Sequence, residues 1–334
     1  MSEKVTLKDI AANLGTSVVT VSNALSGKKG VSAAMRKKIA DEAARLKFDL
    51  GKYEKKENES LAIGVLVSEQ YISVGTSFYW EMYQNTATAA SKRNVFTTLE
   101  ILSRETEDRG ELPQLFSSEN LEGLIIIGRL GNAYIKKLLS AAEVPVVLLD
   151  FYNPVFQCDA VLSNNYIGMY KATKYLIDRG HTKIGFIGTI EVSDNIRDRY
   201  YGFLRAMKES GLPVNRDWVF GDRNLLTGDY SITLPQVLPT AFACSGDYTA
   251  GHLYEEFLLR NIRIPEDISV TSYDDYLFGH PFSGQLTTFR VDMEKMAGLA
   301  VDILKKKIEG SDSFHGVQYV DGEIVERSSV RSLR

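Results

Sequence analysis

The stretch that decides the fold lies at the N-terminus and reads Val5-Thr6-Leu7-Lys8-Asp9-Ile10-Ala11-Ala12-Asn13-Leu14-Gly15-Thr16-Ser17-Val18-Val19-Thr20-Val21-Ser22-Asn23-Ala24-Leu25. Apolar residues recur at helical spacing on both sides of Gly15, and Thr6 and Ser17 are placed to cap two short helices. A short turn that contains glycine between two such helices is typical of a helix-turn-helix. A third helix is expected after Ser32, so residues 5–47 are predicted to form an all-α head.

The head is basic, whereas the rest of the chain is acidic. Residues 1–56 hold 12 Lys and Arg against 6 Asp and Glu, and the remainder of the 334 residues holds 27 against 37, which leaves a net charge of -4. Because phosphate contacts supply most of the non-specific affinity for DNA, this asymmetry indicates a DNA-binding module attached to an acidic body. Helical spacing alone leaves open an ordinary helical subdomain with a basic surface.

The second helix is expected to present side chains to DNA base edges in the major groove. Val18 and Val19 are suited to contacts with thymine methyl groups, and Asn23 is suited to pairing with adenine. The other DNA-binding candidates lie at helix starts or offer hydroxyl and ammonium groups to phosphates, and they are Thr6, Leu7, Ser17, Thr20, Ser22, Lys28 and Lys29.

Residues 49–60 carry no apolar period and are predicted to form a solvated linker after a head of residues 1–48. Beyond the linker, short Ile/Val/Leu-rich runs alternate with amphipathic stretches, which indicates parallel sheets covered by helices on both faces. The expected strands are 61–67, 123–127, 144–149, 183–187, 241–244 and 269–273, and the expected helices include 167–179, 199–210, 249–260 and 293–309.

The core is expected to contain two similar lobes. Ile63-Gly64-Val65-Leu66-Val67 opens one alternating series, and Ile184-Gly185-Phe186-Ile187-Gly188 opens another about 120 residues later. We therefore assign residues 61–162 plus 291–315 to the N-terminal lobe and residues 163–290 plus 316–334 to the C-terminal lobe. A ligand is expected between them, because clefts between domains and the carboxyl ends of parallel strands are favoured binding sites.

Several classes of protein are disfavoured by the composition. The two cysteines, Cys158 and Cys244, offer neither a disulfide framework nor the spacing of a metal site, and we expect no metal and no cofactor. The start of the chain lacks an apolar signal core, and apolar runs such as 124–127 are too short to span a bilayer, so a cytoplasmic protein without membrane contact is expected. Neither a phosphate-binding loop nor a hydrolase or metalloprotease motif occurs, so we do not expect an enzyme.

The N-terminal stretch, continued by Val31-Ser32 and the third helix, resembles the head of the LacI/GalR family of bacterial transcriptional regulators. Further stretches resemble landmarks of the family's core in the same order, namely 180–188, 199–203, 264–270 and 286–288. The resemblance covers nearly the whole chain and implies an α/β fold: an all-α helix-turn-helix head followed by a two-lobed, periplasmic-binding-protein-like core with parallel sheets. It also implies a homodimer that binds a near-palindromic operator in double-stranded DNA as a repressor, under the control of a small effector that we expect to be a carbohydrate.

The resemblance carries over to individual effector contacts. Arg199 stands where the family uses an arginine to hold ligand hydroxyls or a carboxylate, and its five donors suit that task. Asp274 looks like the family's ligand-binding aspartate. Phe78 and Tyr79 stand where the family often has an aromatic pair at the mouth of the cleft, although both are also ordinary core residues.

Three further effector-binding candidates follow from position. Asp150 and Tyr152 come after a predicted strand whose end faces the cleft, and Arg223 stands near a position where many relatives place a stacking aromatic. Arg223 would admit an anionic ligand, although a solvent-facing arginine is the commoner explanation. Gly246 stands where many relatives place an asparagine, so the familiar galactoside contacts are not expected.

Two alternative functions remain open. The linker 49–60 lacks the Pro-Asn start and the wedging leucine of relatives with a hinge helix, so the chain is alternatively a cytosolic sugar-binding protein with a weakened DNA-binding head. The second alternative is an enzyme that uses Arg199 and Asp274 on a carbohydrate.

Overall fold

A computed structural model describes residues 5–25, 31–48, 61–72, 77–118, 120–225, 227–276, 279–311 and 316–334. The chain forms two compact units, residues 1–60 and residues 61–334, which we call the head and the core. The predicted linker 49–60 and the DNA-binding candidates Lys28 and Lys29 lie outside the described residues.

The head contains α1 (Leu7–Leu14), α2 (Val18–Leu25) and α3 (Ala33–Arg45). The start of α1 is fixed by Asp9, whose carboxylate accepts the Thr6 N–H at 2.7 Å, and α1 ends at Gly15 with φ of +62°. A residue with a side chain pays a steric penalty in that left-handed conformation, which is why glycine suits the turn between α1 and α2. The three helices bury one apolar cluster, formed by Ile10, Ala11, Val21, Ala24, Ile39 and Ala43.

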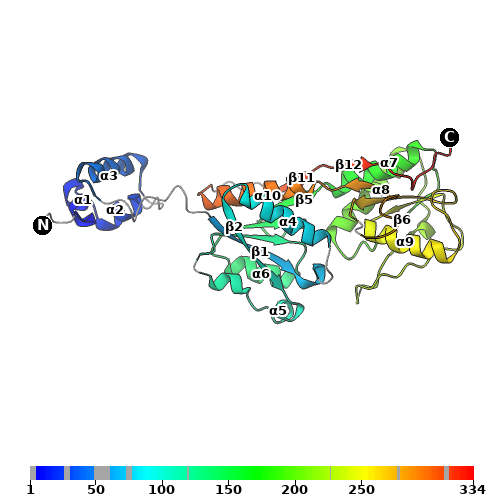
Figure 1. The fold of residues 1–334 in the computed structure, drawn as a ribbon, viewed down its shortest axis with the longest axis horizontal. Coiled ribbons are helices and arrows are strands. Elements are labelled where there is room, and N and C mark those ends of the chain that lie inside the picture. Colours follow the sequence, from blue (N-terminus) through cyan, green and yellow to red (C-terminus); the bar gives the residue numbers. More distant parts are fainter. Residues whose placement is uncertain are drawn as a thin grey trace. The chain divides into compact units, whose positions relative to one another are not determined.

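The core contains two six-stranded sheets, each the centre of one lobe (Figure 1). The first sheet has the order β11-β5-β4-β3-β1-β2, and its strands all run parallel. Its bounds are β1 (Leu61–Ser68), β2 (Val95–Leu102), β3 (Gly123–Ile127), β4 (Val146–Leu149), β5 (Asp159–Ser163) and β11 (Val317–Val320). The helices α4 (Phe78–Ser91), α6 (Asn132–Ala141) and α10 (Met293–Ile308) pack on this sheet. The same lobe contains α5 (Arg104–Arg109) and the short 3-10 turns η2 (Glu69–Tyr71) and η3 (Gln114–Ser117).

The second sheet has the order β12-β10-β9-β8-β6-β7, with β12 antiparallel to β10 and the other strands parallel. Its bounds are β6 (Ile184–Ile187), β7 (Val219–Phe220), β8 (Ala241–Cys244), β9 (Ser269–Asp274), β10 (Thr287–Arg290) and β12 (Glu323–Val325). It is accompanied by α7 (Asn165–Asp178), α8 (Asp194–Glu209), α9 (Asp247–Leu259) and the 3-10 turn η4 (Arg216–Trp218).

The chain passes between the lobes three times, after β5, after β10 and after β11. The last crossing differs from the assignment of residues 316–334 to the C-terminal lobe, because β11 pairs with β5 in the first sheet and only β12 belongs to the second. The short edge strand β11 has three of its four residues incompletely buried, so it carries no clear apolar signal. The family's α/β architecture of a helical head and a core of parallel sheets is otherwise as expected.

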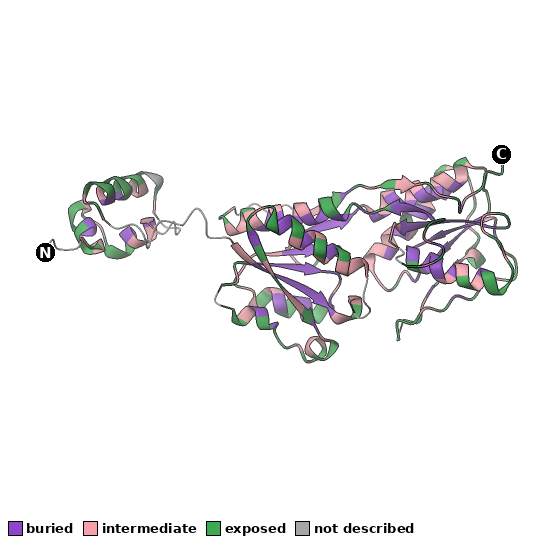
Figure 2. Ribbon diagram, in the orientation of Figure 1, coloured by how far each residue is buried: buried purple, intermediate pink, exposed green. Residues whose placement is uncertain are grey.

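Burial explains why the central strands form where they do. Figure 2 shows the central strands largely in the buried colour, with exposed residues on the outer helix faces. All five residues of β3 and all four of β6 and β8 are buried, as expected for parallel strands covered on both faces. Among the described helices, none combines the length and the apolar character needed to cross a membrane.

Candidate DNA-binding and ligand-binding sites

The turn between α1 and α2 presents the start of the predicted recognition helix to solvent. The Ser17 hydroxyl accepts the Thr20 N–H at 3.0 Å and so caps α2. Val18 and Val19 follow it with exposed fractions of 38% and 67%. Two adjacent exposed valines are costly in water, and their position at the start of α2 suits an apolar contact with base edges.

The other head candidates differ in their exposure. Thr6 and Ser17 are exposed, whereas Thr20, Ser22 and Asn23 are half-buried. The expectation for Leu7 needs refinement, because its side chain is half-buried against the head's apolar cluster and contributes to packing.

An arginine that was not among the DNA-binding candidates ties two helices of the head together. The Arg36 guanidinium in α3 donates to the Ala24 carbonyl near the end of α2 at 3.0 Å. Because the last carbonyls of a helix lack partners within the helix, this bond fixes the position of α2 against α3.

In the core, the carboxyl ends of strands from both lobes bring polar candidates together. Asp150 follows β4 directly and Asp274 is the last residue of β9. Both have positive φ values, +64° and +113°. Non-glycine residues in such conformations cost free energy and concentrate at functional sites, so these two strand ends mark the core's candidate ligand site.

Arg199 lies in the second turn of α8 and is 7% exposed. Its Nη2 lies 3.2 Å from Asp274 Oδ1, and its Nε and Nη1 donate to Asn165 Oδ1 at 2.7 Å and to the Ser245 carbonyl at 2.6 Å. Its guanidinium carbon stands 3.8 Å from the centre of the Tyr273 ring. Burial opposes the charge on Arg199, but the negative charge of Asp274 leaves its pKa above the ordinary value. The sequence-predicted pair Arg199 and Asp274 is therefore a buried ion pair.

Asp150 is the first lobe's contribution and is 3% exposed. The Tyr79 hydroxyl donates to its Oδ2 at 3.1 Å, while its Oδ1 is buried without a hydrogen-bond partner among the described residues. The pKa of Asp150 is raised to about 7: burial is the main cause and the charge of Asp274 adds to it, while Arg199, Tyr79 and Asn195 oppose the shift. Asp150 is thus a carboxyl group poised between its neutral and ionised forms near neutral pH.

Aromatic rings and direct hydrogen bonds join the two lobes at the same place. Phe78 and Tyr79 stand at the start of α4, with ring centres 5.3 Å apart, and the Phe78 ring lies 6.1 Å from that of Tyr276 in the second lobe. Asn195 in α8 donates to the Asp150 carbonyl at 2.9 Å. The structure therefore brings Phe78, Tyr79, Asp150, Arg199 and Asp274 to one junction between the lobes.

Arg223 does not offer a free charge to a ligand. Its Nε and Nη2 donate to the two carboxylate oxygens of Asp222 at 3.0 and 2.9 Å, and its guanidinium lies 4.3 Å from the centre of the Tyr230 ring. Although burial disfavours the Asp222 carboxylate, its hydrogen bonds with Arg223 hold its pKa below the usual value. The earlier interpretation of Arg223 as an anion-binding group loses its basis, because the adjacent Asp222 neutralises it.

Tyr152 stands beside this junction, and its role in ligand binding stays a prediction. It is half-buried and packs on the apolar cluster behind the first sheet. The charges that act on its hydroxyl are those of Asp198 and Asp194, on α8. No described contact joins Tyr152 to Arg199, Asp150 or Asp274.

Sequence analysis missed several residues that hold the candidates in place. Asn165 and Asn195 hold Arg199 and Asp150, as described above. Asp247, at the start of α9, accepts the Tyr276 N–H at 2.7 Å and the Thr288 hydroxyl at 2.7 Å, and burial raises its pKa to about 8. Asn165 and Asp247 come two and three residues after strand ends, which is a signal that would have found them.

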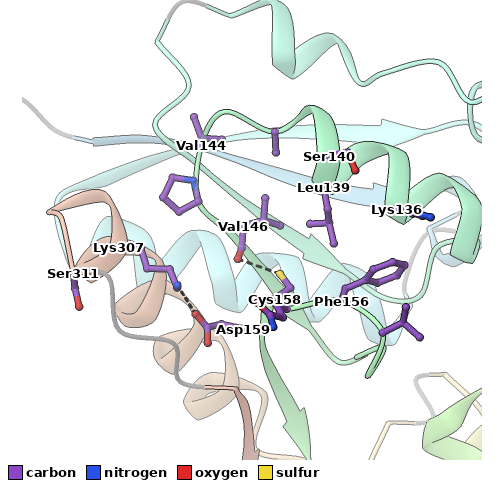
Figure 3. Close-up of a pocket in the computed structure, with 14 residues that line it drawn as sticks. Lys136, Leu139, Ser140, Val144, Val146, Phe156, Cys158, Asp159, Lys307 and Ser311 are labelled. Atoms are coloured by element: carbon purple, nitrogen blue, oxygen red, sulfur yellow. Dashed lines mark hydrogen bonds and ion pairs between the residues drawn. The ribbon is translucent and has the colours of Figure 1, made fainter.

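Asp274 also borders a groove of about 620 Å³ whose other walls include Glu81, Asn85 and Arg290. A second groove, of about 610 Å³, lies on the first lobe near the start of β5 and is lined by none of the predicted site residues. Figure 3 shows Lys307 turned toward Asp159 in this second groove, and their charged atoms lie 2.7 Å apart. The buried Asp159 carboxylate is therefore already paired with Lys307.

The arrangement defines a class of protein: a DNA-binding regulator with a helix-turn-helix head and a two-lobed ligand-binding core. Residues 6–49 match the model of the bacterial regulatory proteins of the lacI family, and residues 173–330 match the periplasmic binding protein-like domain. The chain belongs to the LacI/GalR family of bacterial transcriptional regulators.

Relatives extend over nearly the whole chain. The transcriptional repressor PurR of Vibrio cholerae is 28% identical over 336 residues, covering 98% of each chain, and PurR of Pasteurella multocida is 26% identical, covering 98% of this chain and 99% of the relative. The solved structure of the regulator CelR in complex with cellobiose has a TM-score of 0.68 at 20% identity and covers 97% of this chain and 99% of that one. The lac repressor dimer bound to operator and the anti-inducer ONPF has a TM-score of 0.67 at 20% identity, with 98% and 100% covered. These two structures establish the likeness of fold.

Proposed function

We propose that the protein is a cytoplasmic homodimeric repressor whose affinity for its operator is set by a small ligand bound between the two lobes of the core. The observation that carries this proposal is the junction of Phe78, Tyr79 and Asp150 from the first lobe with Arg199 and Asp274 from the second. A ligand that contacts both lobes changes the free-energy difference between the open and the closed core. Through linkage, this change alters the affinity of the protein for DNA.

The proposed DNA contact is made by the start of α2. Val18 and Val19 meet bases, Ser17 and Thr20 meet phosphates, and Asn23 follows on the same helix. These separate base and phosphate contacts fit the general pattern in which phosphate contacts position a protein and base contacts give specificity. In a C2 dimer the two recognition helices would meet two half-sites about one helical turn apart.

Carbohydrate is the ligand class that we propose from the residue types. Aromatic rings pack against the apolar faces of a sugar, and carboxylate and guanidinium groups bind its hydroxyls. The solved complex of CelR with cellobiose has the same fold and a saccharide ligand. Catalysis is not part of the proposal, because the carboxyl groups at the junction are bound to Arg199 and Tyr79 and no motif for covalent chemistry accompanies them.

The test begins with DNA. We would select duplexes that bind the full-length chain from a random library and measure their affinity at several salt concentrations. A sequence-specific regulator is expected to prefer selected over random DNA by about a thousandfold or more. A preference below tenfold would favour the alternative of a sugar-binding protein with a weakened head.

The second step is a thermal-shift screen with mono- and disaccharides, repeated with Arg199→Ala and Asp274→Ala. Ligands that bind the native state raise its apparent stability, and a ligand held at the junction loses that effect in both variants. A ligand that both variants still bind would refute the proposed site. Asp108→Asn serves as the control, because Asp108 is an exposed residue of α5 and is expected to leave ligand binding unchanged.

A further inference from the structure

The hydrogen-bonding groups at the junction are unequally satisfied. Both arginines are bound within the protein: Arg199 by Asn165, Ser245 and Asp274, and Arg223 by both oxygens of Asp222. A ligand phosphate or carboxylate would have to compete with these partners for the two cations. Because a buried cation that loses its partner is costly, the junction is poorly suited to an anion.

In the part of the chain that the structure describes, one carboxyl oxygen at the junction lacks a hydrogen-bond donor. Asp150 Oδ1 is buried without a hydrogen-bond partner among the described residues, while its other oxygen accepts from Tyr79. Buried polar atoms in native proteins are nearly always satisfied, so an unpartnered carboxyl oxygen in a ligand site points to a group that the ligand supplies. While Asp150 is ionised, that group must carry N–H or O–H.

The balance of charge selects between those donors. Asp150 and Asp274 share the charge of Arg199, because Asp222 neutralises Arg223. Aromatic rings lie beside Asp150, whose partner is Tyr79. The centre of the Tyr79 ring lies 4.4 Å from the centre of the Tyr71 ring and 5.3 Å from that of Phe78. Carboxylates beside aromatic faces are the surroundings that favour an organic cation.

Gly246 provides room beside the ion pair. A Cβ atom at this position would lie 3.1 Å from Asp274 Oδ2 and 3.7 Å from Arg199 Nη1. A larger side chain, such as the asparagine of many relatives, would therefore occupy the space next to the Asp274 carboxylate. Its absence leaves that oxygen accessible to a ligand group.

We propose that the effector carries a protonated amine, as in an amino sugar, which binds Asp150 Oδ1 at the junction of the two lobes. This inference rests on the proposed function, because it concerns the ligand of the same site. A neutral polyol, whose hydroxyl would satisfy the same oxygen without adding charge, is the competing ligand class.

The proposal predicts a specific pH dependence. The charged and titratable groups that act on Asp150 are Tyr71 and Tyr79 from the first lobe and Arg199, Tyr273 and Asp274 from the second. Burial raises the pKa of Asp150 to about 7, and an amine requires the ionised carboxylate. The amine of a hexosamine has a pKa of about 7.7, like an α-amino group, so its binding should peak near pH 7.4, where the carboxylate is ionised and the amine is still protonated. Binding of putrescine, whose amines stay protonated, should strengthen as pH rises from 6 to 8. Binding of a neutral polyol through a protonated Asp150 should weaken or stay constant over the same range.

The experiment compares matched compounds on the full-length chain by thermal shift and calorimetry. The probes are glucosamine, galactosamine and mannosamine, each beside its parent hexose and its N-acetyl derivative, with putrescine as an amine that lacks the sugar ring. We expect at least one amine to bind about tenfold more tightly than its uncharged counterpart at about pH 7.4, since charge-assisted hydrogen bonds are roughly twice as strong as neutral ones. Asp150→Asn should abolish that preference, and Asp108→Asn, an exposed site, should leave it intact.

The proposal is overturned if a parent hexose binds as tightly as its amine, if Asp150→Asn keeps the preference, or if no amine binds. The same compounds are then added to the complex with selected DNA. A neutral ligand that changes DNA affinity would refute the amine and leave the proposed regulator intact. An amine that binds the core without changing DNA affinity would refute the proposed regulation and leave the ligand class intact.

Discussion

Asp150→Asn is expected to stabilise the core, and by a larger margin at pH 8 than at pH 5.5. Burial raises the pKa of Asp150 from its ordinary value of 3.8 to about 7 in the folded protein. Between those values the folded state holds a proton that the unfolded chain has released. The unfolding free energy contributed by this group therefore falls as pH rises from about 4 to about 7.

The magnitude follows from the shift. Each pKa unit corresponds to about 1.4 kcal/mol, so a rise of about three units costs at most about 4 kcal/mol once Asp150 is fully ionised. At pH 5.5 the cost is about 2 kcal/mol, because the folded carboxyl is still protonated. An asparagine keeps the shape and never ionises, so its advantage should grow by about 2 kcal/mol between pH 5.5 and pH 8.

Urea unfolding followed by tryptophan fluorescence measures this difference in the core alone. The only tryptophans are Trp80 and Trp218, and both belong to the core. The buried Asp247 also titrates, but it is present in both proteins and cancels in the comparison. An advantage that is equal at the two pH values, or smaller at pH 8, would refute the assignment of Asp150 as a carboxyl destabilised by burial.

Three further predictions concern the head and the ion pair. Gly15→Ala places a side chain at φ of +62° with nothing within 4 Å, so backbone strain alone should lower the stability of the head by about 1 kcal/mol. The temperature at which DNA binding is lost, measured by fluorescence anisotropy, should therefore fall. An unchanged temperature would contradict this. Val19→Asp, at a site 67% exposed, should leave the thermal unfolding of the helices in circular dichroism unchanged yet weaken binding to selected DNA at least tenfold. Wild-type affinity would remove Val19 from the interface. Arg199→Met leaves the Asp274 carboxylate buried without its cation and should cost about 3 to 5 kcal/mol in urea unfolding of the core, whereas a loss under 1 kcal/mol would show that the pair is dispensable.

Several central strands were predictable because burial on both faces makes them continuous apolar runs. β3 and β6 were expected within a residue of their observed bounds for this reason. The interior strands β5 and β10 were missed, because their sequences contain polar residues. The edge strands were not predicted either, since β2 has exposed residues at Phe96, Thr98 and Ile101, and the two-residue β7 is too short to show a period. Edge strands are covered on fewer sides, so their sequences carry a weaker signal.

The start of α8 shows how tertiary context changes a helix boundary. The helix was expected from Arg199, but it begins at Asp194, where the Ser193 hydroxyl caps it by accepting the Ile196 N–H at 3.2 Å. The added turn carries Asn195, which bonds to the first lobe. Its polar residues gave no helical period because they face the other lobe, and a sequence-based prediction does not include that contact.

Contacts made by individual side chains were beyond the reach of the sequence. The rule that ligands gather at the carboxyl ends of parallel strands selected Asp150, and the family resemblance supplied Asp274. Neither revealed that the neighbouring Asp222 would neutralise Arg223, nor that Tyr152 would pack on an apolar cluster of the first lobe. Both outcomes depend on side-chain directions after a strand end, and these vary with the local turn.

The backbone at the two strand ends supplies an argument that the sequence alone lacks. Asp150, Asp274 and Asp275 all have positive φ, where glycine is the least strained residue and aspartate is tolerated at a cost. At each of these positions a carboxyl group is present despite the strain in the backbone. The Asp275 carboxylate accepts hydrogen bonds from Arg290 and Arg327 at 2.8 and 2.7 Å. Asp274 has Arg199 as its partner, but Asp150 Oδ1 has none among the described residues. A buried carboxyl group on a strained backbone, with a described hydrogen bond to only one of its oxygens, does not stabilise the folded state. Its presence at the junction is best explained by a ligand that donates a hydrogen bond to the other oxygen.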